Sequence, residues 1–357
     1  MEIDSRRPAL TPLNEQTGGK IIGKGSYGCA FDPPLKCADG SEKEHSGHKV
    51  GKMTSKSEAL KENYITAILK QIPDAEKYYS ILLDTCTLKP RTQQEETDLR
   101  KCDVLVRKPY ARFTQLIMPY SGQSIHFFNK EIKSGAVDFY AFGRQLLEAA
   151  ALLLTRGVVH YDLHKGNILV RDLSAPTIID FGLSWQVKLL PKIAGDLASH
   201  NYEPEYAQYS PELSIPEALN SGLPLDDLLF REILEKKRVS KMAERLLGVS
   251  IDGAVKDLGD FVRHSISVKE RNWLKFYQMY WPKFDAWSVG RILLEMYYAI
   301  TSGRGYRPTP QDAVYARVLR GLSASSPKKR LNAAQALTLW DPASPVLRSA
   351  DVQMWTK

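Results

Sequence analysis

The chain has 357 residues, of which 43% are hydrophobic and 25% are charged, and it carries a formal net charge of +8. This is the composition of a globular protein, and the length suits one large domain or two smaller ones. No run approaches the roughly 20 apolar residues that a membrane-spanning helix needs, so we expect no membrane partner. The basic residues are scattered along the chain, which predicts an ordinary solvated surface and argues against nucleic acid as a partner.

The first 18 residues are polar, contain prolines and lack an apolar core. They predict an N-terminal tail without regular structure and without a secretory signal. After this tail, residues 19–31 (GKIIGKGSYGCAF) predict two short strands joined by a glycine turn. Residues 48–53 alternate as a strand does, and residues 55–72 have helical spacing up to Pro73. Residues 101–120 contain two strand-like runs, VLV and QLIM, so the first 120 residues are expected to be mainly β with one helix.

Beyond residue 120 the pattern becomes helical. A long helix is expected over residues 137–157, and short strands over NILVRD and APTIIDFG. Further helices are predicted over residues 225–248 and 284–300. A small β-rich region followed by a large helical one indicates an α+β protein with two lobes, and a cleft between lobes is a natural place for a ligand.

Four cysteines occur in the chain: Cys29, Cys37, Cys86 and Cys102. They are too sparse for a disulfide framework, and without an export signal we expect free thiols in a reducing compartment. Two of them, Cys29 and Cys37, could hold zinc together with His45 and His48. The wide spacing of the two cysteines and the loop-like composition of residues 38–47 argue against that site.

Three polar segments carry the chemistry. In GKGSYG (residues 23–28) the glycines let backbone N–H groups approach phosphate oxygens closely. A strand follows this turn, and a Rossmann dinucleotide fold would need a helix there. Lys52 shares a strand face with Val50, and a lysine on an inward face needs a partner, which Glu58 or Glu62 on the next helix or a phosphate could supply.

The third segment, HYDLHKGN (residues 160–167), lies between apolar flanks. Asp162 and Asn167 lie in it, and Asp180 follows an apolar strand and precedes a glycine turn. Carboxylate and amide oxygens suit Mg²⁺, which keeps phosphate as a further ligand. If Asn167 and Asp180 hold the metal, Asp162 is left to accept a proton from a hydroxyl group.

Together these segments resemble a eukaryotic-type protein kinase over residues 19–340. GKGSYG resembles the glycine-rich loop, VGK the strand that carries the ATP-orienting lysine, and HYDLHKGN the catalytic loop. DFG (residues 180–182) is unaltered, SPE (210–212) resembles the end of the activation segment, and DAWSVG (285–290) resembles the buried-aspartate motif. The resemblance also implies that Arg330 pairs with Glu212.

The resemblance implies a two-lobed kinase fold, with an N-lobe at 19–120, a C-lobe at 121–347 that contains a helical insert at about 213–284, and a C-terminal tail at 348–357. It also implies ATP and Mg²⁺ as cofactors and proteins as substrates. Asp162 would be the catalytic base, Asn167 and Asp180 the Mg²⁺ ligands, and Lys52 the group that grips the ATP phosphates. The implied nucleotide-binding residues are Gly23, Lys24, Gly25, Ser26, Gly28, Ala30, Val50, Lys52, Glu62, Met118, Pro119, Ser121 and Leu169.

The sequence departs from the family pattern at several positions. Tyr161 replaces the arginine that usually receives an activation-loop phosphate, which predicts activity without that phosphorylation. His164 stands where serine/threonine kinases usually carry lysine, and Lys165 is next to it, so the choice between Ser/Thr and Tyr acceptors stays open. Ala30 stands where the family usually has a valine over the adenine, and Val50 stands where it usually has an alanine, so the two side-chain sizes are exchanged.

Within kinases, GSYGCAFDPPLKC and HYDLHKGN resemble the serine/threonine protein kinases of nucleocytoplasmic large DNA viruses. That narrower resemblance implies a viral protein in the host cytoplasm, possible virion packaging and virion proteins as partners. Two alternatives stay open. One is a small-molecule phosphotransferase of the aminoglycoside or choline type, and the other is a catalytically silent kinase-fold structural protein of a virion.

Overall fold

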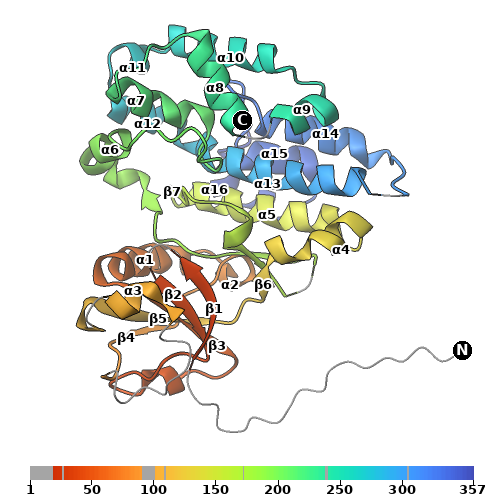
Figure 1. The fold of residues 1–357 in the computed structure, drawn as a ribbon. Helices are drawn as coiled ribbons and strands as arrows, with labels where there is room; N and C mark the ends of the chain where they lie inside the picture. Colours follow the sequence, from red (N-terminus) through yellow and green to blue (C-terminus); the bar gives the residue numbers. More distant parts are fainter. Residues whose placement is uncertain are drawn as a thin grey trace, which may run out of the picture. The chain divides into compact units, whose positions relative to one another are not determined.

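The structure, a computed structural model, describes residues 19–25, 28–90, 101–107, 110–171, 173–237, 240–303 and 305–357. The expected tail at residues 1–18 and the nucleotide-binding candidate Ser26 lie outside these residues. The chain forms two compact units. The first comprises residues up to 60 together with 82–120, and the second comprises residues 61–81 together with 121–357. Figure 1 shows the strands of the first unit and the helices of the second.

The first unit is built on a five-stranded sheet with the order β1-β2-β3-β5-β4, in which every neighbouring pair is antiparallel. This sheet contains the strands expected in residues 19–31 and 48–53 and at QLIM. The strands are β1 (Lys20–Gly25), β2 (Gly28–Asp32), β3 (Lys49–Ser55), β4 (Asp84–Cys86) and β5 (Phe113–Pro119).

The glycine turn joins β1 to β2, with Gly25 opposite Gly28. A Cβ atom on Gly28 would lie 1.6 Å from the carbonyl oxygen of Met53 on β3. Strands β2 and β3 pair beside this residue, with Cys29 opposite Met53. Glycine is therefore required at position 28 by the close approach of two strands, in addition to any role in binding phosphate.

The expectation of free thiols is wrong for this structure. Cys29 is bonded to Cys102 and Cys37 to Cys86, and all four cysteines are thereby paired. The bonds join positions 73 and 49 residues apart, so the sheet brings together sulfur atoms that the sequence keeps distant. No group of three or more His, Cys, Asp or Glu side chains in the described part of the chain could hold a metal ion. His48 instead pairs with Asp32, with 2.8 Å between Nε2 and Oδ1.

A second correction concerns the run VLV at residues 104–106. It lies in a short helix, α3 (Asp103–Arg107), and not in a strand. Leu105 is buried in the same apolar cluster as Cys29 and Phe113. Three apolar residues cannot distinguish a strand from one turn of a buried helix, because both bury such a run.

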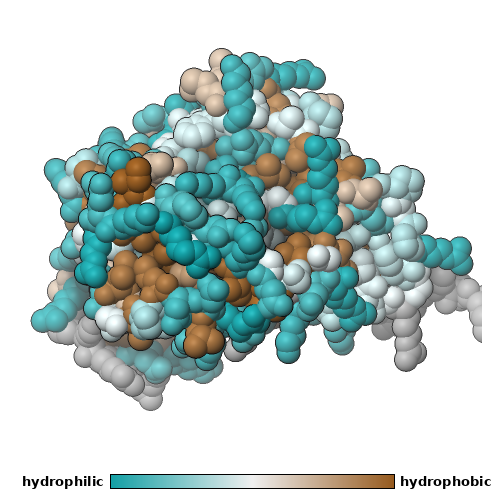
Figure 2. All heavy atoms as spheres, turned by 90° about the horizontal axis from the view of Figure 1, so that it is seen from above, coloured by the Kyte–Doolittle hydropathy of each residue, from teal (hydrophilic) through white to brown (hydrophobic). Residues whose placement is uncertain are grey.

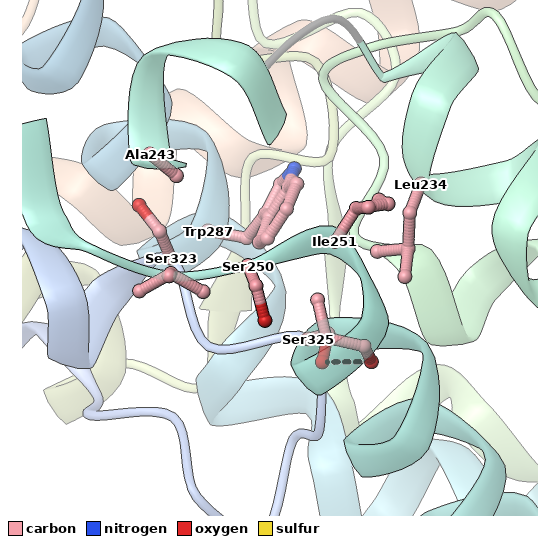
Figure 3. A pocket seen from close by; sticks show the side chains of 9 residues that line it. Leu234, Ala243, Ser250, Ile251, Trp287, Ser323 and Ser325 are labelled. Carbon is pink, nitrogen blue, oxygen red and sulfur yellow. Dashed lines mark hydrogen bonds between the residues drawn. The ribbon is translucent and has the colours of Figure 1, made fainter. Parts of the chain in front are cut away.

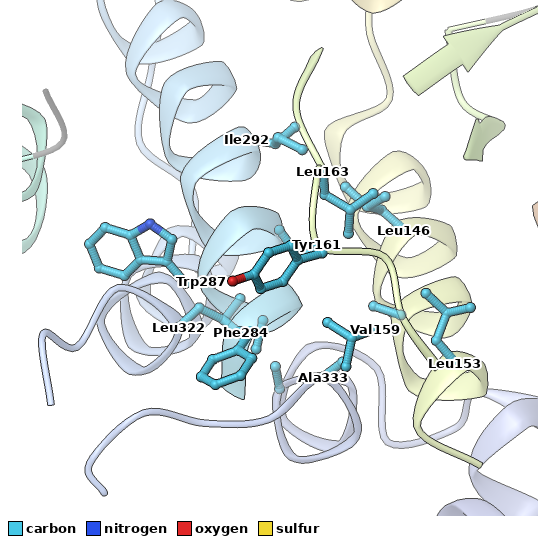
Figure 4. Packing of buried hydrophobic residues seen from close by; sticks show 14 of the residues in the cluster. Leu146, Leu153, Val159, Tyr161, Leu163, Phe284, Trp287, Ile292, Leu322 and Ala333 are labelled. Atoms are coloured by element: carbon cyan, nitrogen blue, oxygen red, sulfur yellow. The ribbon is translucent and has the colours of Figure 1, made fainter. Parts of the chain in front are cut away.

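The second unit is mainly helical, and its two longest helices lie side by side (Figure 1). The helix expected at 137–157 is α5 (Phe139–Thr155), and the one expected at 284–300 is α13 (Phe284–Thr301). Asp138 caps α5 by accepting a 2.9 Å hydrogen bond from the N–H of Ala141, and Gly157 follows the helix with φ of 58°. Apolar side chains from both helices form the core that Figure 4 shows, with Tyr161 inside it.

Most of the other helices and strands contribute side chains to the same core. The helix expected at 55–72 is α1 (Lys56–Leu69), which starts in the first unit and continues into the second. The short strands at NILVRD and APTIIDFG are present as β8 and β9. The other elements of this unit are α2 (Ala75–Tyr78), α4 (Asn129–Ser134), α6 (Leu190–Ala198), α7 (Ser214–Asn220), α14 (Gln311–Leu322), α15 (Ala333–Trp340), α16 (Ala350–Gln353), β6 (Gln123–Ser124), β7 (Val158–Val159), β8 (Ile168–Val170), β9 (Pro176–Ile178) and β10 (Trp185–Gln186).

The long segment between SPE and DAWSVG folds into α7 and a set of further helices. The single helix expected at 225–248 is two helices in the structure. We call residues 213–284 the insert. Its helices after α7 are α8 (Asp227–Lys236), α9 (Ser240–Leu247), α10 (Ile251–His264), α11 (Ile266–Lys269) and α12 (Trp273–Tyr280).

A cavity of about 30 Å³ lies beneath the insert, lined by side chains of α8, α9, α10, α13 and the loop after α14 (Figure 3). The Ser323 hydroxyl is buried at this cavity and has no hydrogen-bond partner among the described residues. The volume suits one or two water molecules. It is far too small for a nucleotide.

Hydrophilic and apolar residues are mixed on the face that Figure 2 shows, with separate brown patches among the teal. Among the described residues, no helix combines the length and the apolar character that crossing a membrane would require.

Candidate active site

The backbone of HYDLHKGN is held by one buried carboxylate. Asp285, in the first turn of α13, accepts hydrogen bonds from the N–H groups of His160 (2.7 Å, to Oδ2) and Tyr161 (3.0 Å, to Oδ1). Burial raises the pKa of Asp285 above its ordinary value. The aspartate singled out in DAWSVG therefore holds the backbone at the first two residues of the candidate catalytic loop.

The His160 ring links this loop to the segment that precedes DFG. Its Nδ1 accepts a 3.3 Å hydrogen bond from the N–H of Asp162, so Nε2 carries the proton and donates to the carbonyl of Ile179 at 2.9 Å. The ring also lies 4.8 Å from that of Phe181, measured between centroids. Because His160 bonds to both segments, it fixes the spacing between the loop and DFG.

Asp162 is held on both carboxylate oxygens. Its Oδ1 accepts hydrogen bonds from the Tyr206 hydroxyl and the Gln208 amide, both at 3.0 Å. Its Oδ2 accepts one from Nδ2 of Asn167 at 3.2 Å. The side chain is 16% exposed, so it is oriented by neighbours and still reachable from solvent.

Asn167 and Asp180 offer oxygen atoms of the kind that Mg²⁺ binds. Nδ2 of Asn167 donates to the carbonyl and the carboxylate of Asp162, which leaves its Oδ1 for another partner. Its backbone carbonyl accepts from the N–H of Ile179 at 3.0 Å, beside Asp180 in the chain. Asp180 has φ of 64°, a left-handed backbone that is uncommon outside glycine and often marks a functional site. One amide and one carboxylate oxygen, completed by phosphate oxygens and water, fit a magnesium ion.

The lysine after His164 is engaged elsewhere. The Lys165 ammonium lies 3.0 Å from Oε2 of Glu295 on α13. His164 itself accepts a 3.0 Å hydrogen bond from the N–H of Gly166 on Nδ1, so its proton is on Nε2, which lies 3.8 Å from Oδ2 of Asp162. Burial lowers the pKa of His164, which favours the neutral ring. The position two residues after Asp162 thus presents a neutral N–H donor where an ammonium group is usual.

Tyr161 is buried, with 5% of its surface exposed, and has φ of 69°. Its ring centroid lies 4.6 Å from that of Tyr209 and 5.9 Å from that of Trp185. Burial raises its pKa well above the ordinary value. An uncharged aromatic group therefore fills the place where protein kinases usually have an arginine.

The candidates for nucleotide binding lie in both units. In the first unit Lys52 pairs with Ala30 on β2 and with Leu116 on β5, while Val50 pairs with Met118. The other candidates in the first unit are Gly23, Lys24 and Gly25 on β1, Gly28 on β2 and Pro119 on β5. Those in the second unit are Glu62 on α1, Leu169 on β8, and Ser121, which lies outside the strands. Glu62 and Ser121 are 3% and 4% exposed.

The ion pair expected between Arg330 and Glu212 is present. The Nη1–Oε1 and Nη2–Oε2 distances are 2.6 and 2.7 Å, and both side chains are fully buried. The pair joins the residue after Pro211 to the segment before α15.

Sequence reasoning missed Tyr206 and Gln208, the two side chains that bond to Asp162. They lie directly before SPE, in a segment without periodicity or a motif of its own. The only available signal was their place between DFG and SPE, which marks the segment as part of the site without singling out these residues.

Comparison with known proteins supports the kinase resemblance at a distance. Over 231 residues the chain is 24% identical to "Serine/threonine-protein kinase AGC1-7" of Arabidopsis thaliana. The chain is similar to a protein kinase. The match covers 57% of this chain and 41% of the relative, so the chain matches less than half of that protein's length. No protein-family model matches the chain. The mixed α+β structure, with a β-sheet region first and a helical region after it, is consistent with a kinase fold.

Proposed function

We propose that the chain is an ATP-dependent protein kinase that transfers the γ-phosphate to a serine or threonine hydroxyl of a protein. The observation that best supports this is the arrangement around Asp162, whose carboxylate is oriented by Asn167, Tyr206 and Gln208 and is still partly exposed. A carboxylate held in this way can accept the proton of an attacking hydroxyl group. The similarity to a plant kinase points to the same chemistry.

In this proposal Asn167 and Asp180 hold Mg²⁺, which when bound neutralises charge on the ATP phosphates. Lys52 orients those phosphates and Glu62 orients Lys52. The glycines of β1 and β2, with Ser26, cover the phosphates. Ala30, Val50, Met118, Pro119, Ser121 and Leu169 surround the adenine. Pro119 has no N–H group, so it can offer adenine only its carbonyl, and Ser121 supplies the donor.

The proposal that the acceptors are serine and threonine rests on the similarity to a serine/threonine kinase, because His164 does not distinguish them from tyrosine. The narrower part of the proposal, a viral kinase that acts in the host cytoplasm and is packaged in virions, rests on the sequence motifs alone. A small-molecule phosphotransferase and a silent structural protein are the outcomes that would replace it.

The test is transfer from γ-labelled ATP with Mg²⁺ to casein and to a basic acceptor protein, followed by phosphoamino-acid analysis. Loss of a general base typically costs about 10²–10⁴ in rate, so Asp162→Asn should be nearly silent, as should Asp180→Ala. Asp351→Asn, an exposed carboxylate on α16, serves as the matched control and should keep full activity.

Phosphoserine or phosphothreonine that disappears in both variants would support the proposal. Transfer only to small hydroxyl compounds would replace it with the phosphotransferase alternative. A folded protein that binds no ATP would favour the structural role.

A further inference from the structure

The end of the segment between DFG and SPE is tied down through its backbone. The Lys237 ammonium, at the C-terminal end of α8, donates to the carbonyl of Tyr206 at 2.8 Å. From α13, the Ser288 hydroxyl donates to the carbonyl of Gln208 at 2.6 Å, and the Trp287 ring N–H donates to that of Ala207 at 3.4 Å. Consecutive carbonyls of residues 206–208 are thus bound by side chains of the insert and of α13.

Lys237 is an unusual residue to find in this place. It is fully buried, and burying an ammonium group is costly unless it is well paired. Burial lowers its pKa to about 8, and the carboxylate of Glu217 on α7 opposes that shift. An apolar side chain of similar length would fill the same volume without this cost, so the charge is better explained by what it binds than by packing.

The residues whose carbonyls are bound carry the side chains that hold Asp162. Both Tyr206 and Gln208 donate to Oδ1 of that carboxylate at 3.0 Å. The Tyr206 ring also lies against that of Tyr209, with 4.6 Å between centroids. A continuous set of contacts therefore runs from Lys237 in the insert, through Tyr206, to Asp162.

A second helix of the insert contacts the start of the segment between DFG and SPE. Tyr277 on α12 lies 6.3 Å from Trp185, and Trp185 lies 5.9 Å from Tyr161, measured between ring centroids. Tyr161 carries no positive charge and cannot recruit a phosphate. The contacts that order this segment are hydrogen bonds and aromatic packing, which need no modification to form.

We propose that the insert permanently positions the catalytic base: Lys237 fixes the backbone of Tyr206, whose hydroxyl holds Asp162, so that phosphorylation of the activation segment is not needed. This inference rests on the proposed kinase function. Lys237 and Tyr206 are positioning residues in it, since each acts through another group. The competing explanation is that Lys237 only braces the fold.

The test is steady-state kinetics on the full chain, with Lys237→Met, Tyr206→Phe and the double variant, beside Lys236→Met as a matched control. Lys236 is the exposed neighbour of Lys237 on α8. Losing one orienting hydrogen bond should cost about tenfold in kcat, with KM for ATP unchanged, in each single variant. Lys237 and Tyr206 both act on the carboxylate of Asp162. The kcat of the double variant should therefore be no lower than that of the more impaired single variant. The control should match wild type.

Several outcomes would overturn the inference. If Tyr206→Phe keeps full kcat, the hydroxyl does not position the base, and this holds even if Lys237→Met fails to fold. If Lys237→Met lowers kcat by the same factor in the wild-type background and in the Tyr206→Phe background, Lys237 acts independently of Tyr206, as a brace of the fold. Phosphate found on Tyr206 by peptide mass spectrometry, or activity abolished by phosphatase treatment, would also contradict it. A wild-type protein that transfers no phosphate defeats the proposed function itself and is seen before any variant is compared.

Discussion

Arg330 and Glu212 are 118 residues apart in the chain, and their side chains form a two-point ion pair with no exposure to water. The guanidinium also donates to the carbonyls of Ala324 and Lys283. Such a pair stabilises a fold poorly compared with apolar packing, yet it is costly to break, because the remaining charge stays buried without its partner.

We therefore expect Arg330→Met to lower the free energy of unfolding by about 3–5 kcal/mol, measured by urea denaturation. Adding Glu212→Met should recover much of the loss, because no unpaired carboxylate then remains. Lys329→Met is the control, since its pair with Asp257 is exposed and should contribute little. A small loss in Arg330→Met, equal to that of the control, would contradict the expectation.

Asp162 and Asp285 show what single residues in the sequence do and do not reveal. Both were recognisable because each lies in a short motif with apolar flanks. Tyr206 and Gln208 were not, since they lie 44 and 46 residues from Asp162, in a short stretch before SPE that carries no motif of its own. Lys165 lies beside the site in the sequence, but its ammonium pairs with Glu295 on α13. Nearness along the chain did not decide which side chains meet.

At the scale of elements, the sheet of the first unit carries two disulfide bonds. One joins β2 to the start of α3, and the other joins the loop after β2 to β4. Cross-links of this kind stabilise a fold mainly by restricting the unfolded chain.

Replacing either pair with alanines, Cys29 with Cys102 or Cys37 with Cys86, should lower the free energy of unfolding by about 2–4 kcal/mol. Reducing the wild-type protein should likewise lower its free energy of unfolding relative to the oxidised protein, as measured by denaturation of both forms. Peptide mapping without reductant tests the pairing itself. Four thiols that react readily with a thiol reagent in the native protein would contradict both bonds.

The insert shows the limits of periodicity for elements. The amphipathic pattern over residues 225–248 predicted helix, and helix is present, but as α8 and α9 rather than one element. Helix α8 ends at Lys236, and the next residue, Lys237, bonds to the carbonyl of Tyr206. An element boundary that depends on a contact with another part of the fold is not encoded in local spacing.

For the whole molecule, the buried Glu217 gives stability a pH dependence. Burial raises its pKa to about 7, from 4.5, and its Oε2 has no hydrogen-bond partner among the described residues. Between pH 4.5 and 7 the folded protein then retains a proton that the unfolded chain releases. Stability from this group is fully present below pH 4.5 and is lost as the pH rises through 7.

Glu217→Gln should remove this dependence, because glutamine does not titrate. Each pKa unit corresponds to about 1.4 kcal/mol, so the unfolding midpoint of wild type should fall relative to that of the variant as pH rises from 5 to 7. Urea denaturation at several pH values measures the difference. Glu232→Gln, an exposed carboxylate on α8, is the control and should run parallel to wild type. A constant gap between wild type and Glu217→Gln would show that the carboxyl is not perturbed.

The amino-acid sequence predicts the α+β class and most elements, and it singles out Asp162, Asn167, Asp180 and Lys52 as candidate site residues and Asp285 as the buried aspartate. Local periodicity and short motifs specify these features, because each depends on neighbours within a few residues. Only the folded chain shows the cysteine pairing, the helical state of VLV, the partner of Lys165 and the chain of contacts from Lys237 to Asp162. These features depend on which distant side chains become buried together, and burial is a property of the folded chain that no local pattern records.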